Sequence, residues 1–393
     1  MKARNDVKHV FIVGSKGIPA HYGGFETFVD KLTEYHQNEP ELKYHVACRS
    51  LENNDSFEYH NADCFRVKVP KLGSAQAIYY DIAALFRVCK YIKQHKIPDS
   101  IVYILACRIG IFAPYFQKKI HRLGGKLYLN PDGHEWKRSK WPLPVRMYWK
   151  ISESIMVRSA DMIVCDNQHI EQYIQNTYHK SAKQTTYIPY GAEIDSVISE
   201  ETERKLNAWL QEKGISANGY YLSVGRLVPE NNYETMIREY MRTGTDKSYV
   251  IITTLDTKYL DLFEKTTRYS VDPRIKFVGP VYDQELLNGI RQNAFAYLHG
   301  HEVGGTNPSL LEAMATTGAV LLNDVSFNRE VAKDTAFYWT KQDGALSQLI
   351  DSLETDKAKP LLLQKQVEAK QRIAQDFSWR SISERYRSTW MDR

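Results

Sequence analysis

Short apolar runs alternate along the whole chain with segments whose apolar residues recur at helical spacing, as in residues 74–96. Because strands that alternate with helices usually pair in parallel, this pattern predicts parallel sheets with helices on both faces. Runs that predict strands lie near residues 8–13, 43–48, 64–69, 100–106, 126–129, 161–165 and 185–188 in the first half, and near 219–224, 248–253, 275–278, 294–298, 319–322 and 336–339 in the second.

A polar and charged segment, residues 190–219, separates the two series of strands and is typical of a hinge with a small helix. We therefore predict an α/β protein with two Rossmann-like domains, residues 1–195 and residues 196–377, that face each other across a cleft. In such folds ligands bind at the carboxyl ends of the strands.

The composition is that of an ordinary soluble globular protein: of 393 residues, 43% are hydrophobic and 25% are charged. The sequence shows neither a signal-peptide pattern nor an apolar run of membrane-spanning length. Its five cysteines have no CxxC spacing, so we expect reduced core thiols and a cytoplasmic protein.

Positive charge is concentrated in the first half of the chain. Residues 1–195 hold 27 Lys and Arg against 20 Asp and Glu, whereas residues 196–393 hold 25 against 27. We expect the first half to meet an anion, for which nucleic acid and a membrane surface are the alternatives. The sequence has no motif of a known nucleic-acid-binding fold, so we expect no nucleic-acid partner.

A glycine-rich loop follows the first predicted strand. In residues 11–28 the strand ends at Gly14 and a helix begins near Gly23 and Gly24, which lets the backbone approach a phosphate or sugar closely. An ordinary tight turn is the alternative interpretation. A dinucleotide site would require an acidic residue after the second strand, where this chain has Arg49.

Two further motifs follow strands of the second half. Arg226 comes directly after one strand, where it either binds a ligand phosphate or forms a surface ion pair. In residues 299–315 a glycine-rich loop leads into a helix with Asn307 as its N-cap and Pro308 as its first residue. The free N–H groups of such a helix start favour an anion. Glu312, one turn further on, either accepts hydrogen bonds from sugar hydroxyls or interacts with the helix dipole.

Residues 129–158 form a basic and aromatic segment that begins after a strand, so Asp132 and His134 are expected at the carboxyl edge of the sheet. Basic residues mixed with Trp and Tyr are typical of contact with an anionic membrane, and equally of an amphipathic helix whose aromatic residues lie in the core. The candidate acceptor or membrane contacts are Lys137, Arg138, Lys140, Trp141, Arg146 and Trp149.

Together these motifs resemble the GT-B glycosyltransferases, and among them the retaining family four. That family has a paired glycine like Gly23-Gly24, a strand followed by Gly-Arg, and an E-x7-E motif that ends like LLEAMA at residues 310–315. More narrowly, GIPAHYGGFETFV, PDGHEWKRSKW, GRLVPENNYE and GHEVGGTNPSLLEAM resemble a subgroup of bacterial rhamnosyltransferases whose N-terminal region is catalogued as a domain of unknown function. The resemblance covers essentially the whole chain.

Two positions depart from the family pattern. Gly304 stands where E-x7-E has its first glutamate, with Glu302 two residues away, and Asn231 stands where the family has a lysine. The chain also contains no Asp-x-Asp motif, which in the other main glycosyltransferase fold holds a metal. We therefore expect that no metal or other cofactor is required, and that Arg226 and the helix N-terminus stabilise the leaving diphosphate.

The resemblance implies transfer of L-rhamnose, with retention, from a nucleotide diphosphate sugar such as dTDP-rhamnose to a polyprenyl-diphosphate-linked saccharide of the cell surface. The C-terminal domain would bind the donor and the N-terminal domain the acceptor, with residues 378–393 forming a helix that returns to the N-terminal domain. The implied donor-binding residues are Gly23, Gly24, Arg226, Asn231, Gly304, Gly305, Thr306, Asn307, Ser309 and Glu312, and the candidate catalytic residues are His134, Asp132 and Glu302.

The implied location is cytoplasmic, peripheral to the inner face of an anionic membrane. Two alternatives share the fold. One is transfer from another donor such as UDP-glucose, and the other is a sugar-nucleotide epimerase, which would need no acceptor surface.

Overall fold

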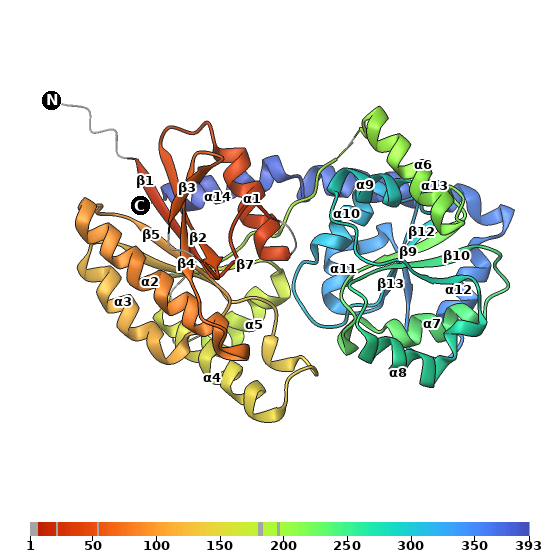
Figure 1. Cartoon of the computed structure of the whole chain (residues 1–393), viewed down its shortest axis with the longest axis horizontal. Coiled ribbons are helices and arrows are strands. Elements are labelled where there is room, and N and C mark those ends of the chain that lie inside the picture. The colour runs from red at the N-terminus through yellow and green to blue at the C-terminus, as the bar shows by residue number, and fades with distance from the viewer. Residues whose placement is uncertain (1–6, 21–22, 53–54, 180–183, 195–196, 393) are drawn as a thin grey trace. The chain divides into compact units, whose positions relative to one another are not determined.

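The computed structural model describes residues 7–20, 23–52, 55–179, 184–194 and 197–392. The chain divides into two compact units, each built around one sheet (Figure 1). Unit 1 comprises Met1–Tyr190 and Trp379–Arg393, and unit 2 comprises Gly191–Ser378. Both are α/β with mainly parallel sheets, as the alternation of runs predicts. The expected domain junction between residues 195 and 196 lies outside the described residues.

Unit 1 contains an eight-stranded sheet in the order β3-β4-β2-β1-β5-β6-β7-β8. The central strands are apolar on both faces because helices cover both sides; in β5 all five residues are buried. The strands are β1 (Lys8–Val13), β2 (Leu42–Ser50), β3 (Ser56–Tyr59), β4 (Ala62–Lys68), β5 (Ile101–Leu105), β6 (Lys126–Asn130), β7 (Met162–Cys165) and β8 (Thr185–Tyr187).

Strand β3 is absent from the sequence prediction, and it pairs antiparallel with β4 at the edge of the sheet. It has four residues, none of them buried, so it lacks the apolar run that marks the inner strands. His60 and Asn61 connect it to β4 with φ angles of 46° and 56°, as a tight two-residue hairpin requires.

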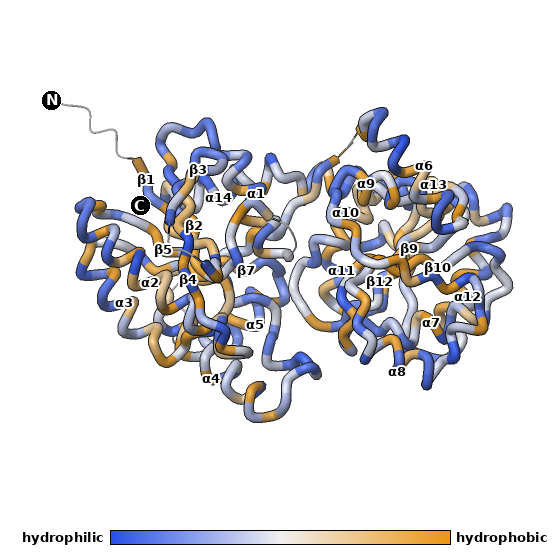
Figure 2. The backbone as a smooth tube through the Cα atoms, viewed as in Figure 1, coloured by the Kyte–Doolittle hydropathy of each residue, from blue (hydrophilic) through white to orange (hydrophobic). Residues whose placement is uncertain are grey.

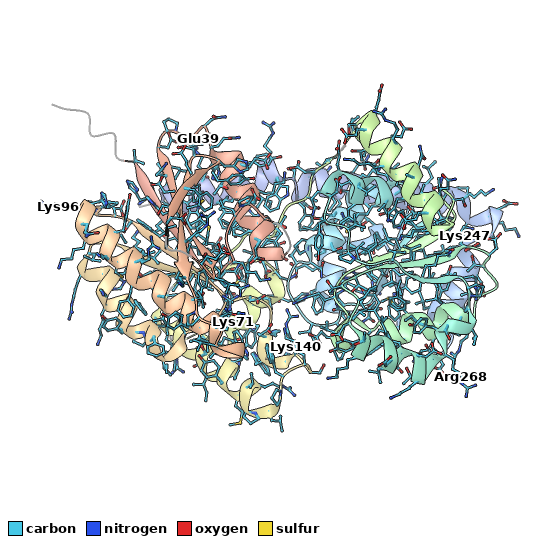
Figure 3. All side chains as sticks on the ribbon, in the orientation of Figure 1. Glu39, Lys71, Lys96, Lys140, Lys247 and Arg268 are labelled. Atoms are coloured by element: carbon cyan, nitrogen blue, oxygen red, sulfur yellow. The ribbon has the colours of Figure 1, made fainter. Side chains whose placement is uncertain are left out.

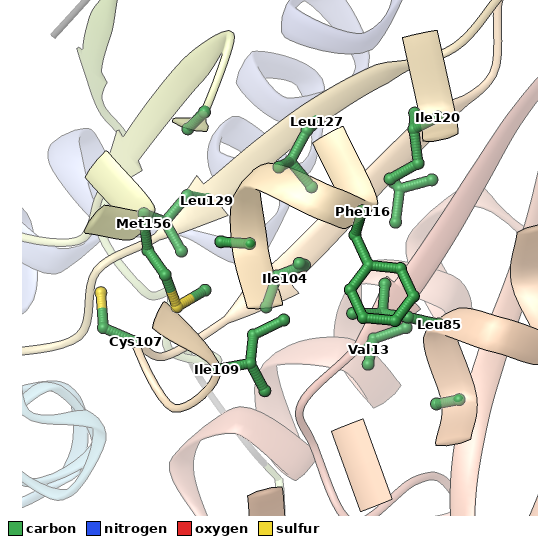
Figure 4. Close-up of a cluster of buried hydrophobic side chains, with 14 of the residues drawn as sticks. Val13, Leu85, Ile104, Cys107, Ile109, Phe116, Ile120, Leu127, Leu129 and Met156 are labelled. Atoms are coloured by element: carbon green, nitrogen blue, oxygen red, sulfur yellow. The ribbon is translucent and has the colours of Figure 1, made fainter. Parts of the chain in front are cut away.

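Helices cover both faces of the unit 1 sheet: α1 (Gly24–His36) and α14 (Trp379–Met391) on one, and α2 (Gln76–His95), α3 (Ala113–Arg122), α4 (Leu143–Ser159) and α5 (Gln168–Tyr178) on the other (Figure 1). Under the second group, Phe116 lies beside Leu85 and Val13 in the apolar core (Figure 4). All five cysteines are buried free thiols, as expected. No helix in the described part of the chain is long and apolar enough to cross a membrane.

Unit 2 contains a six-stranded, fully parallel sheet in the order β11-β10-β9-β12-β13-β14. Its strands are β9 (Tyr220–Val224), β10 (Ser248–Ile252), β11 (Ile275–Phe277), β12 (Ala296–His299), β13 (Val320–Asn323) and β14 (Phe337–Trp339). Its helices are α6 (Glu200–Lys213), α7 (Tyr233–Met241), α8 (Thr257–Thr267), α9 (Gln284–Gln292), α10 (Pro308–Thr316), α11 (Ser326–Ala332), α12 (Ala345–Leu353) and α13 (Lys359–Asp376).

The strand order reverses once in each sheet, beside the first strand of the unit. In unit 1, β1 lies between β2 and β5, and in unit 2, β9 lies between β10 and β12. Doubly wound sheets bind ligands at the carboxyl ends of the strands on either side of such a reversal. The loops after β9 and β12 are therefore the first place to look for a binding site in unit 2.

A chain of hydrogen bonds attaches α14 to the sheet of unit 1. Trp390 Nε1 donates to Tyr44 Oη at 2.9 Å, Tyr44 Oη lies 2.7 Å from His36 Nδ1, and His36 Nε2 lies 3.0 Å from the carbonyl oxygen of Ser383. Because a carbonyl only accepts, Nε2 carries the proton and Tyr44 donates to Nδ1. The chain therefore requires a neutral His36, and burial lowers the pKa of this residue to about 4.

We expect unit 1 to lose stability as the pH falls below about 6.5, because unfolded His36 then binds a proton that the folded residue excludes. With a folded pKa of about 4 against 6.5, the loss is about 2 kcal/mol between about pH 7.5 and pH 5. Urea unfolding measures it: His36→Gln should be less stable than the wild type at the higher pH, yet lose less stability on acidification.

Other buried histidines whose pKa values are lowered by burial, such as His45, titrate alike in both proteins and cancel from this comparison. The exposed His169→Gln is the control and should keep the wild-type pH dependence. If His36→Gln and the wild type lose the same free energy on acidification, the required neutrality of His36 is wrong.

Candidate functional site

The carboxyl ends of β9 and β12 meet the first turn of α10. Tyr297 Oη donates to the carbonyl oxygen of Val224 at 3.0 Å, and Ser309 Oγ lies 2.9 Å from Tyr297 Oη and 3.3 Å from the same carbonyl. As predicted, Asn307 caps the helix: its side-chain oxygen accepts from the backbone N–H of Ser309, at 2.9 Å, and of Leu310. The start of α10 is thereby fixed beside the end of β9.

Arg226 lies at this junction, two residues after β9 ends. Its side chain is exposed and forms no hydrogen bond or ion pair with the residues that the structure describes. Its carbonyl oxygen accepts from Asn231 Nδ2 at 2.9 Å and from the backbone N–H of Val228 at 3.0 Å. Asn231 is itself buried, so it shapes the turn that presents Arg226.

Glu312 forms an ion pair that the sequence analysis did not anticipate. One carboxylate oxygen lies 2.5 Å from Nη2 of Arg291, which comes from α9 and is 1% exposed at its side chain, whereas the Glu312 side chain is 27% exposed. A buried arginine needs a counter-ion, so this pair ties α10 to α9. The signal available in the sequence is an arginine on the apolar side of a predicted helix.

The loop between β12 and α10 is held at Gly300 by contacts with Asn231 and Asn232. The carbonyl oxygen of Gly300 accepts from Asn232 Nδ2 at 2.8 Å, and a Cβ at Gly300 would lie 2.3 Å from the carbonyl oxygen of Asn231, so only glycine fits. Gly304, in contrast, has φ of 150° and no heavy atom within 4 Å of an added Cβ. The loop is therefore anchored at its start and open around Gly304.

Near this loop, Glu302 carries a paired charge and His299 is buried and neutral. Glu302 Oε2 lies 2.5 Å from Nζ of Lys341, so this candidate catalytic carboxylate is ion-paired. His299 is fully buried, neither ring nitrogen has a hydrogen-bond partner among the described residues, and its ring stacks on His301 at 4.2 Å. Burial lowers the pKa of His299 to about 3, so the imidazole is neutral. No pattern in the sequence marks His299.

In unit 1, Asp132 and His134 follow β6, as predicted, and both adopt left-handed backbone conformations with φ of 60° and 42°. The Asp132 carboxylate accepts from the backbone N–H of Gly133 at 2.8 Å. The His134 ring meets Tyr173 edge-on at 4.3 Å. Burial, with Lys137 and other cations nearby, lowers the pKa of His134 to about 4, so the imidazole is neutral near pH 7.

Next to Tyr173, against which His134 packs, lies a cluster of polar side chains centred on the buried Glu153. Glu153 Oε1 accepts from Tyr178 Oη at 2.7 Å, from Tyr173 Oη at 2.5 Å and from Lys150 Nζ at 3.2 Å. The cluster fixes the tyrosine ring against which His134 packs. It spans helices α4 and α5, so sequence spacing gave no sign of it.

Many polar side chains of the basic and aromatic segment bond to other residues of the same segment. Glu135 accepts from Trp141 Nε1 at 2.7 Å and pairs with Arg138 Nε at 2.5 Å and Lys140 Nζ at 2.9 Å. Although burial opposes it, these cations lower the pKa of Glu135. Arg146 Nε donates to the carbonyl oxygen of Trp136 at 2.8 Å. The remaining two candidates in this segment are Lys137, which is exposed, and Trp149, which is half-buried.

The paired glycines stand at the start of α1, where Gly23 is the N-cap and Gly24 the first helical residue. Gly23 has φ of 128°, and an added Cβ would lie 1.9 Å from Glu26 Oε2. The other oxygen of Glu26 accepts from the backbone N–H of Lys16 at 2.6 Å. A close approach of the chain's own carboxylate thus accounts for Gly23, in line with the tight-turn interpretation.

The two units match different families. Residues 7–193 match DUF1972, a domain of unknown function, and residues 207–372 match the family of glycosyl transferases group 1. Unit 2 contains a group 1 glycosyltransferase domain. This domain includes Arg226, the loop after β12, and α10 with Glu312. No curated protein matches the chain.

Solved structures show that the fold is GT-B. Sucrose-phosphate synthase from Thermosynechococcus elongatus aligns with a TM-score of 0.76 at 16% identity, covering 98% of each chain. Anabaena HepE in complex with UDP and glucose aligns with a TM-score of 0.68 at 16% identity, covering 98% of this chain and 99% of its own. Trehalose 6-phosphate synthase from Burkholderia multivorans aligns with a TM-score of 0.68 at 12% identity, covering 98% and 96%.

We expect Gly300→Ala to destabilise unit 2 by about 2 kcal/mol, because the new methyl group collides with the carbonyl oxygen of Asn231 and the junction must shift. Urea unfolding of the full chain measures the change. Gly244→Ala is the matched control, since an added Cβ there has no heavy atom within 4 Å. If the two variants have the same free energy of unfolding, the loop accommodates a methyl group at position 300 and the predicted collision with Asn231 is wrong.

Proposed function

We propose that the protein transfers L-rhamnose from dTDP-rhamnose to a lipid-linked saccharide, with retention of configuration. The observation that carries the donor site is the junction in unit 2, where exposed Arg226 stands beside the capped start of α10. The choice of rhamnose rests on the resemblance of the chain's motifs to the rhamnosyltransferase subgroup. The HepE complex with UDP and glucose supports a nucleotide-sugar donor and makes UDP-glucose the alternative.

In this proposal the donor diphosphate binds at residues 303–309. The start of α10 offers the positive end of the helix dipole, while the N–H groups of Ser309 and Leu310 bond the Asn307 cap. Arg226 adds a guanidinium that no carboxylate neutralises among the described residues, and it stabilises the charge that develops on the leaving diphosphate. Asn231 contributes by holding the turn of Arg226, and the open space around Gly304 admits the sugar next to Gly305 and Thr306.

Glu312 accepts a hydrogen bond from the ribose. Its ion pair with Arg291 engages one carboxylate oxygen, and the other remains available for a hydroxyl. The pair also offsets the negative charge that would otherwise repel a diphosphate bound one turn away. Arg291 therefore makes a carboxylate compatible with an anion site.

Unit 1 binds the acceptor, a polyprenyl-diphosphate-linked saccharide, at the inner face of an anionic membrane. Asp132 and His134 contact the reacting sugars, and the neutral His134 imidazole offers both a hydrogen-bond donor and an acceptor at neutral pH. Glu302, held by Lys341, substitutes for the glutamate that the family has at the position of Gly304.

A panel of nucleotide sugars tests the proposal. We expect dTDP-rhamnose to raise the thermal unfolding temperature of the full chain and to be turned over with a lipid-linked acceptor, also in EDTA, since Arg226 and the α10 dipole stabilise the leaving group. If only UDP-glucose raises the unfolding temperature and is turned over, the donor is UDP-glucose and not dTDP-rhamnose. Turnover that EDTA abolishes and Mg²⁺ restores would contradict the metal-free mechanism, and isomerisation of the donor without transfer would favour an epimerase.

We expect Arg226→Ala to lower kcat/KM, with a loss of transition-state stabilisation of about 2–4 kcal/mol. The variant loses a charge-assisted contact to the diphosphate, and Asn231 carries no charge to replace it. Steady-state kinetics with the donor measures the loss. Arg238→Ala, which removes a surface arginine paired with Glu234 on α7, should change kcat/KM little. Near-normal turnover of Arg226→Ala would remove this residue from the donor site.

A further inference from the structure

Exposed apolar side chains gather on one side of unit 1. Leu143, Met147 and Ile151 recur at every fourth position of α4 and are 70%, 65% and 55% exposed. Residues spaced by four form one stripe along a helix. In Figure 2 the backbone tube near the α4 label carries both hydrophobic and hydrophilic positions.

The stripe continues onto the neighbouring helices. Phe86 of α2 and Tyr115 of α3 are exposed, and their ring centroids lie 6.1 Å apart. Ile111, just before α3, is 65% exposed. The adjoining residue, Gly110, donates its backbone N–H to Ser152 Oγ of α4 at 2.8 Å. Since α3 packs against both α2 and α4, these residues belong to one surface, which we name the three-helix face.

Charge on the three-helix face has a single sign. Residues 76–95 contain three Lys or Arg, residues 110–122 contain three and residues 136–151 contain five. The only acidic residue in these segments is Asp81, which is fully buried and lies 3.2 Å from Arg108. Figure 3 shows the charged side chains that project from this region, with Lys96 just after α2 and Lys140 just before α4. No carboxylate of these three segments is therefore exposed.

We propose that the three-helix face docks on an anionic lipid bilayer. Apolar side chains enter the boundary of the acyl chains while Lys and Arg remain at the level of the phosphates. Lys119 illustrates the arrangement, because its Nζ lies 4.8 Å over the ring of Phe86 and 5.6 Å over that of Tyr115. The inference deepens the proposed function: it rests on that function for its purpose, which is to bring unit 1 to a lipid-linked acceptor.

The apolar stripe lies within the basic and aromatic segment that the sequence singled out, but it consists of other residues than the candidates named there. There, Arg138, Lys140 and Trp141 are engaged by Glu135, so they have less to offer a membrane. Nucleic acid is the other polyanion that cations attract, yet it is bound through phosphates and base edges and would leave a stripe of Leu, Met and Ile uncovered. The combination of the apolar stripe with the exposed cations Lys90, Lys118 and Arg122 favours lipid.

Co-sedimentation of the full chain with vesicles tests the proposal. We expect binding to vesicles of phosphatidylcholine and phosphatidylglycerol, and little binding to phosphatidylcholine alone. A variant with Leu143→Ser, Met147→Ser and Ile151→Ser should bind about tenfold or more weakly, because apolar burial is lost. A variant with Lys90→Gln, Lys118→Gln and Arg122→Gln should weaken binding similarly and reduce its dependence on salt.

Matched variants of unit 2 provide the controls. Val271→Ser with Leu363→Ser removes exposed apolar residues, and Lys258→Gln, Lys265→Gln and Arg268→Gln removes three exposed cations around α8, one of which, Arg268, Figure 3 labels. These variants should bind vesicles like the wild type. The proposal is overturned if the wild type does not bind anionic vesicles, if unit 1 and unit 2 variants lose binding equally, or if duplex DNA is bound in preference to vesicles.

Donor turnover separates this inference from the proposed function. All substituted positions are exposed, so hydrolysis of dTDP-rhamnose by the stripe variant should match that of the wild type. Vesicle binding without any turnover of dTDP-rhamnose would refute the proposed function and leave the docking surface standing. Turnover of dTDP-rhamnose with no vesicle binding would refute the docking surface and leave the proposed function standing.

Discussion

The carbonyl oxygen of Val224 is where the junction proposed as the donor site of unit 2 is assembled. Hydroxyls of Tyr297 and Ser309 converge on it, which joins the end of β9 to β12 and to the first turn of α10. A carbonyl at the end of a parallel strand has no further strand partner, so side chains must satisfy it. By doing so they bring the turn that carries Arg226 to the start of α10, and the chemistry proposed for the donor depends on that adjacency.

Charge around this junction is balanced so that one cation remains available. Glu312 is compensated by Arg291, and Glu302 by Lys341, while Arg226 has no counter-ion among the described residues. A site with two uncompensated carboxylates would repel a diphosphate strongly. In the proposed site, the ion pairs would therefore let Glu312 and Glu302 contact the sugar without loss of affinity for an anion.

Periodicity predicted most of the fold because buried parallel strands have continuous apolar runs and helices have capped starts, as at Asn307. It missed β3, an exposed edge strand in which packing and a hairpin turn replace the apolar run. The sequence also placed Arg226, Asp132 and Glu312 at strand ends or helix starts, since those positions follow from local pattern. The partners Arg291, Glu135 and Glu153 could not be assigned, because each pairing, even that of nearby Glu135, depends on side-chain geometry that periodicity does not determine.

The position of α14 has a consequence for synthesis of the protein. Its buried residues Ile382, Tyr386 and Trp390 cover the face of a sheet whose first strand begins at Lys8, so segments before and after unit 2 complete one core. Since α14 follows unit 2 in the sequence, a ribosome releases this helix only after all of unit 2. Unit 2 can therefore fold while the nascent chain is still attached. Unit 1 meanwhile waits with the part of its sheet face that α14 covers still exposed, and a chaperone has that interval in which to bind it.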